Sequence, residues 1–170
     1  MITTIRPTYG RLLEGAPQAI ELDLGHLPAA QRWYQESCAA LQPPAVGGAP
    51  GPPAALVGLG RVALGQGRPV EAREYFRQAL AAQHRNAATT AEAIVYTAKA
   101  LLCEGELAWP AELCGFLLSW PAMPYHVKGV AEKLYADLAI QLPAEDLANA
   151  LTRGKMRPPT EVVAESVGQR

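Results

Sequence analysis

The 170-residue sequence has few aromatic side chains, few cysteines and no excess of charge of either sign. Phe, Trp and Tyr make up only 6% of it although 49% is hydrophobic, so alanine and leucine must supply most of the core. Such a composition suits packed helices better than a sheet sandwich. Because the net charge is −1, the chain as a whole lacks the electrostatic footprint of a DNA- or RNA-binding protein. We therefore predict an all-α fold, and nucleic acid is not the expected partner.

Cysteine and histidine do not occur at the spacings typical of metal sites. Cys38, Cys103 and Cys114 form no Cys-x-x-Cys motif and fall in segments predicted to be helical. We interpret them as buried thiols and not as a metal or redox site. The three histidines have no second histidine or cysteine three or four residues away. The sequence predicts neither a metal ion nor any other cofactor.

Long apolar runs are also missing. None approaches the roughly 18 residues of a membrane-spanning helix, and the first residues, MITTIRPTYGRLLEG, lack the apolar region of a secretory signal. We expect a cytoplasmic protein without a membrane partner. Its length suits a single domain over residues 1–170, which can bury roughly 70% of its unfolded surface.

No constellation of catalytic residues is recognisable. The phosphate-binding pattern Gly-x-x-x-x-Gly-Lys-Ser/Thr does not occur. Gly58-x-Gly60-x-x-Ala63 resembles a dinucleotide fingerprint by letter but follows no clear strand. The adjacent carboxylates Glu145 and Asp146 lie near a predicted helix start, where the helix dipole accounts for both. We predict that the chain is not an enzyme.

The most regular stretch, from Pro52 to Arg85, predicts two antiparallel helices with a tight turn between them. Apolar or small residues recur at i, i+3, i+4, i+7 and i+8 in both halves, which places them on one helical face. Gly65, Gly67 and Pro69 mark the turn. This helical hairpin resembles a tetratricopeptide repeat in its signature positions, Leu56, Leu59, Gly60, Gly67, Ala72, Phe76 and Ala79.

The pattern recurs along the chain around the turn glycines Gly25, Gly67 and Gly105. The resemblance therefore implies a right-handed α-solenoid of about four tetratricopeptide-like hairpins. Within it we expect an irregular first helix over residues 1–24, a Pro/Gly-rich loop over 43–53 and a capping tail over 158–170. The other expected helices span 27–41, 87–104, 109–119, 127–141 and 144–151, with Thr89 or Thr90 capping the helix that begins at Ala87.

The last third also resembles the end of the helical-repeat arm of large bacterial signalling regulators, of the LuxR type or like the maltose activator. The matching features are Leu134 and Leu138, the Leu142-Pro143 corner, and Ala150 followed by Gly154. The resemblance implies a protein-binding or sensor module for signal transduction and transcription regulation. Its implied partner is a protein or peptide, and a nucleotide-hydrolysing switch domain is a further one, covalently attached or separate.

The resemblance places the first helices of successive hairpins side by side, with Val57 and Arg61 next to Val95 and Lys99. Two cations over an apolar floor predict a groove for a peptide that carries a carboxylate; the alternative is that both cations are merely solvated. Val57 is expected to lie off the core face and to tolerate Asp. The rival function is a small-ligand receptor with a pocket late in the stack built from Trp109, Trp120 and Tyr125.

The remaining basic residues have a simpler interpretation. Arginines of the middle hairpin alternate with Glu71 and Glu74 and predict a solvated face. Arg153, Lys155 and Arg157 form a second small cluster without an aromatic platform, which gives little support for nucleic-acid binding through the tail.

Overall fold

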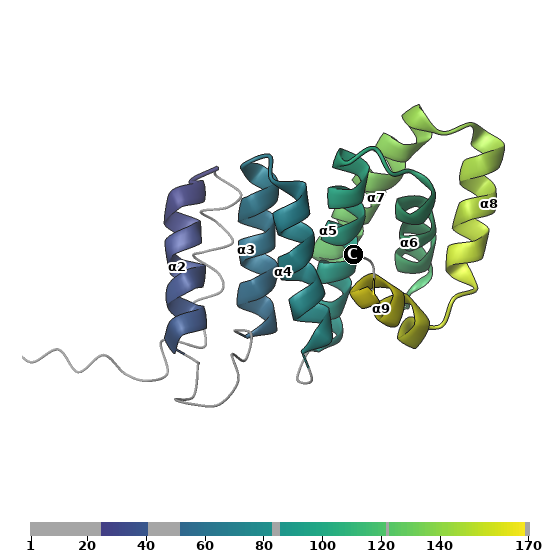
Figure 1. Ribbon diagram of the computed structural model, residues 1–170. Helices are drawn as coiled ribbons and strands as arrows, with labels where there is room; N and C mark the ends of the chain where they lie inside the picture. The colour runs from purple at the N-terminus through teal and green to yellow at the C-terminus, as the bar shows by residue number, and fades with distance from the viewer. Residues whose placement is uncertain (1–24, 41–51, 83–85, 122, 169–170) are drawn as a thin grey trace, which may run out of the picture.

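The computed structural model describes residues 25–40, 52–82, 86–121 and 123–168, which form an all-α, right-handed solenoid of helical repeats, as predicted (Figure 1). The expected first helix over residues 1–24 lies outside the described residues, as does most of the expected loop over 43–53. Pro53, at the end of that loop, already opens a helix. The described helices are α2 (Leu27–Ala40), α3 (Pro53–Gly65), α4 (Pro69–Ala81), α5 (Ala87–Cys103), α6 (Ala108–Ser119), α7 (Tyr125–Gln141), α8 (Ala144–Lys155) and α9 (Pro159–Gly168).

Three glycines set the turns, at the positions that the repeat pattern predicts. Gly25, Gly67 and Gly105 have φ angles of 78°, 72° and 88°, a left-handed conformation that costs glycine little and other residues more. At the α3–α4 turn the N–H of Arg68 donates to the Ala63 carbonyl at 2.9 Å, so the end of α3 is closed by backbone hydrogen bonds. The turns at Gly67 and Gly105 let α4 fold back on α3 and α6 on α5.

Proline opens helices α3 and α4, and a side chain caps α5. Pro53 and Pro69 begin α3 and α4, where their missing N–H groups cost nothing. In α5 the cap is Asn86, whose side-chain oxygen accepts a hydrogen bond from the Thr89 N–H at 2.7 Å. The prediction that Thr89 or Thr90 caps this helix was wrong, because both lie one turn inside it and are buried.

Helix α3 lies between α2 and α4 and meets both through glycines (Figure 1). A Cβ atom on Gly60 would lie 2.3 Å from the Phe76 ring of α4, and one on Gly58 would lie 2.2 Å from the Tyr34 ring of α2. Both aromatic rings therefore occupy the space that a side chain on α3 would need. The two glycines of the apparent dinucleotide fingerprint are packing positions for these rings.

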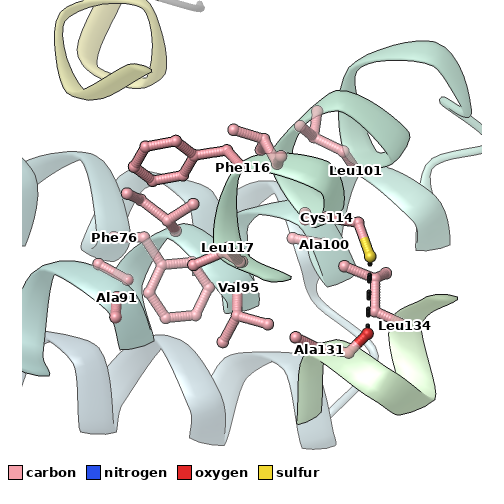
Figure 2. Packing of buried hydrophobic residues seen from close by; sticks show 14 of the residues in the cluster. Phe76, Ala91, Val95, Ala100, Leu101, Cys114, Phe116, Leu117, Ala131 and Leu134 are labelled. Carbon is pink, nitrogen blue, oxygen red and sulfur yellow. Dashed lines mark hydrogen bonds between the residues drawn. The ribbon is translucent and has the colours of Figure 1, made fainter. Parts of the chain in front are cut away.

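The main core runs through the stack from α3 to α9, and Phe76 is fully buried in it. Figure 2 shows its ring close to Val95 and Leu117. Val57 belongs to the same core with only 1% of its surface exposed, because α3 buries residues around most of its circumference. The expectation that Val57 lies off the core face was therefore wrong.

The last two hairpins depart from the regular arrangement. Helix α8 extends to Lys155, beyond the expected Leu151, and packs mainly against α6 instead of its chain neighbour α7. Glycines allow the α6–α8 contact: a Cβ atom on Gly154 would lie 1.8 Å from the Glu112 carbonyl oxygen, and one on Gly115 would lie 2.3 Å from that of Leu151. The Ala150/Gly154 element thus brings two helix backbones into direct contact.

Helix α9 lies against α4 and α5. It covers a flank of the stack, while α8 lies at the far end in Figure 1. Its role as a capping tail remains an interpretation. Among the described helices, none combines the length and apolarity needed to cross a bilayer.

Replacing Phe76 by Asp should unfold the stack, because a carboxylate would replace a buried ring without a partner for its charge. We expect a loss of at least about 4 kcal/mol in the free energy of unfolding, measured by urea denaturation. Leu59→Asp and Val57→Asp should also unfold the stack, because both side chains are buried. Val70→Asp is the control: Val70 is 66% exposed, and its replacement should change stability by less than about 0.5 kcal/mol.

Alanine at two helical glycines should have opposite effects. Gly154→Ala forces apart the α6 and α8 backbones and should destabilise the fold by about 1–3 kcal/mol or more. Gly129→Ala in α7 meets no atom within 4 Å and should stabilise it by about 0.5–1 kcal/mol through helix propensity. Equal thermal shifts for the two variants would contradict the close α6–α8 contact.

Candidate functional site

The first helices α3, α5 and α7 are neighbours in the stack and form what we call the first-helix face. Arg61 of α3 and Lys99 of α5 both approach the ring of Tyr96 on this face. The Arg61 Cζ atom lies 5.0 Å and the Lys99 Nζ atom 5.6 Å from the ring centroid, both within the range of cation–π interactions. Tyr96, Arg61 and Lys99, here called the cation–aromatic cluster, are all half-buried.

Tyr96 links this cluster to the core. Its ring stacks on that of Phe76, with the centroids 6.1 Å apart and the planes inclined by 25°. The sequence-based interpretation missed Tyr96. The sequence feature that could have indicated Tyr96 is its position three residues before Lys99, because residues at this spacing lie on neighbouring turns of one helix.

The structure brings Arg61 and Lys99 together, as the groove hypothesis requires, but it places the two valines differently. Val57 and Val95 are 1% and 0% exposed and form part of the core beneath the face. A partner would therefore touch the cations and the Tyr96 ring, and the valines would support them from below. The groove itself stays a hypothesis.

Two residues of α7 contribute to the electrostatic environment of Lys99. Burial lowers the pKa of Lys99, and the charge of Lys133 acts in the same direction. The Cys103 thiol and the Asp137 carboxylate raise this pKa, while Arg61 lowers it. Lys133 and Asp137 were not predicted from the sequence, because only the stacking of α7 on α5 brings them near Lys99.

The aromatic residues of the expected ligand pocket do not converge. Trp120 lines a hollow with Asn86 and Thr160, at the starts of α5 and α9. Tyr125 is 92% exposed and lines a separate hollow on α7. The Trp109 ring lies under the Arg157 guanidinium, at 4.9 Å. The small-ligand pocket that the sequence suggested is therefore not formed by these three side chains.

The described arginines outside the first-helix face lie next to carboxylates. Arg73 pairs with Glu104 at 2.8 Å and Arg77 with Glu74 at 2.6 Å. The hydrogen bonds from Arg77 and then Gln78 lower the pKa of Glu74 to about 2. Such pairs agree with a solvated face.

The two arginines of the basic cluster of the tail are also engaged with carboxylates. Arg153 lies 2.8 Å and Arg157 3.5 Å from Glu112, and Arg157 also pairs with Glu165. These arginines therefore join α6, α8 and α9, which leaves them poorly disposed to bind a phosphate backbone.

The cysteines differ from one another in burial. Cys114 is buried in α6, its Sγ atom lies 3.6 Å from the Ala131 carbonyl oxygen (Figure 2), and burial raises the pKa of its thiol to about 12. Cys38 is half-buried, whereas Cys103, at the end of α5, is exposed. The expectation of a buried thiol was wrong for Cys103. No group of three or more potential metal ligands occurs within the described parts of the chain.

Comparison with known proteins identifies one repeat. Residues 53–86 match the tetratricopeptide repeat family and span α3, its turn and α4. No curated protein and no solved structure is detectably similar to the chain. Tetratricopeptide repeats are typically non-catalytic and bind protein partners. The match and the α3–α4 hairpin geometry together support a tetratricopeptide-repeat module over residues 53–86, and repeats of this kind typically serve in protein–protein interaction.

Proposed function

We propose that this chain is a non-catalytic module that holds a peptide segment of a partner protein against its first-helix face. The observation that supports this proposal is the approach of Arg61 and Lys99, from two successive first helices, to one aromatic ring. Two cations at a half-buried ring suit a carboxylate next to an apolar group. A partner peptide can supply both within a few residues.

Each part of the cluster has a separate task in this proposal. Arg61 offers a planar fork of donors that fits a carboxylate in a bidentate manner, and Lys99 adds a compact positive charge. The Tyr96 ring provides apolar surface for the stem of the bound side chain. Because Phe76 stacks beneath that ring, the platform is held in place before the partner arrives.

We further propose that the module works in the cytoplasm as the arm of a bacterial signalling or transcription regulator, together with a nucleotide-hydrolysing switch domain. The observation that supports this context is the segment with Leu142-Pro143 and Ala150/Gly154, in which Gly154 allows the close contact between α6 and α8. Copurification from the source cells tests this context. A regulator with a nucleotide-binding domain should be recovered, either as one chain with the module or bound to it, and recovery of other proteins only would contradict this context.

Replacing Arg61 and Lys99 by alanine together should weaken peptide binding at least tenfold, because two charge-assisted hydrogen bonds are lost. The measurement is fluorescence anisotropy at low salt with an array of carboxylate-bearing peptides. The control removes equal charge elsewhere: Arg32→Ala with Lys128→Ala, both exposed and each facing a glutamate of its own helix. Circular dichroism should show full helicity in both variants. Unchanged binding by the folded Arg61/Lys99 variant would exclude this face.

A further inference from the structure

The accessible part of α5 is a narrow stripe that runs along the first-helix face. Between residues 89 and 101, every residue of this helix is buried except Glu92, Tyr96 and Lys99. Their spacings of four and three residues place all three on one side of the helix. We call these three residues the α5 stripe. The stripe extends the cation–aromatic cluster toward the start of α5, where it reaches a carboxylate.

The α5 stripe carries opposite charges at its two ends. Lys99 lies at one end, where Arg61 of α3 approaches the same Tyr96 ring. Glu92 lies at the other end, seven residues earlier in the helix, which corresponds to about 10 Å along the axis. The helix dipole gives no reason for a carboxylate at this place, because Glu92 lies beyond the first turn of α5. The stripe is therefore suited to an acidic group at one end and a basic group at the other.

The Glu92 carboxylate already lies against a nitrogen atom from a neighbouring helix. Its Oε1 atom is 2.5 Å from Nε2 of His126, at the start of α7. Among the described residues, the second carboxylate oxygen has no hydrogen-bond partner. The His126 side chain is 62% exposed and that of Glu92 24%, so the contact is open to solvent. A stronger donor from a ligand can therefore share the carboxylate or replace the imidazole.

We propose that the partner peptide carries a basic side chain, arginine or lysine, which binds the Glu92 carboxylate while the acidic side chain of the peptide binds Arg61 and Lys99. This inference rests on the proposed function and adds a second charge, of opposite sign, to the peptide that the face selects. A guanidinium or ammonium group suits Glu92, because a charged donor strengthens the hydrogen bond to a carboxylate. The imidazole of His126 then occupies the position that the ligand takes.

The length of the α5 stripe limits the spacing of the two charges in the peptide. A chain in the polyproline II conformation advances about 3.1 Å per residue and completes a turn in three residues, so side chains three positions apart lie about 9 Å apart on one side. This distance matches the separation of about 10 Å between Glu92 and Lys99 along α5. We therefore expect the acidic and basic residues three positions apart, with the segment between them over the Tyr96 ring.

The experiment starts from a peptide of the carboxylate array whose binding depends on Arg61 and Lys99. Versions of this peptide carry arginine, alanine or glutamate three positions from the acidic residue, in both chain orders. At about pH 8 and low salt, where exposed charges are weakly screened, the arginine version should bind at least about threefold more tightly than the alanine version in the better order. The glutamate version should bind most weakly. Arginine directly next to the acidic residue should give a smaller gain, because it starts farther from Glu92.

Two substitutions remove the Glu92–His126 contact from opposite sides. Glu92→Gln removes the carboxylate charge, so the ratio of the affinities for the arginine and alanine versions should fall to about one. His126→Ala removes the competing imidazole and leaves the carboxylate, so this ratio should be retained or increased. If the contact only joins α5 to α7, both variants should change peptide binding in the same way, and that result would contradict the basic subsite.

Glu132→Gln is the matched control for the loss of charge. It removes one carboxylate from α7, next to Lys128, and Glu132 lies six residues from His126 on a different side of the helix. The ratio of affinities in this variant should equal that of the native chain. Circular dichroism should show full helicity in all three variants.

The outcomes separate this inference from the proposed function. Equal affinity for the arginine and alanine versions would overturn the basic subsite and leave the carboxylate groove in place. A preference for arginine that persists in Glu92→Gln would also overturn it, because the basic side chain would then bind elsewhere. If no peptide of the array depends on Arg61 and Lys99, the proposed function itself fails, and this inference fails with it.

Discussion

The close packing of neighbouring helices against glycine residues is the constraint on which this solenoid depends. Gly58 and Gly60 let α3 accept an aromatic ring from each neighbour, and Gly115 and Gly154 bring α6 and α8 into backbone contact. Because a Cβ atom has no room at these positions, the glycines let aromatic rings lie directly on α3 and let α6 and α8 meet backbone to backbone. A chain with few aromatic residues can thus form a dense core from alanine, valine and leucine.

The same packing positions the candidate site. Phe76 fills the space beside Gly60 and at the same time supports the ring of Tyr96, which lies between the core and the solvent. Arg61 and Lys99 approach that ring from two helices whose spacing the hairpin packing determines. The stability of the repeat and the geometry of the proposed binding face therefore share one pair of aromatic rings.

Charge is distributed unevenly over the molecule. Arg73, Arg77, Arg153 and Arg157 lie next to glutamates and join neighbouring turns or helices. On the first-helix face, burial and like charges lower the pKa of Lys99 instead. A bound anion would relieve this repulsion, and the net charge of −1 hides such a site when only the composition is considered.

The sequence by itself determined the helical class, the hairpin over residues 53–86 and its turn glycines, because periodicity and left-handed glycine are local properties. It also paired Arg61 with Lys99, through the register of the repeat. Only the tertiary structure decided that Val57 is buried, that α8 turns toward α6, and that Arg61 and Lys99 both approach the ring of Tyr96. These features depend on contacts between residues far apart in the chain, and a helical period shows which residues share a face but not which helix will cover it.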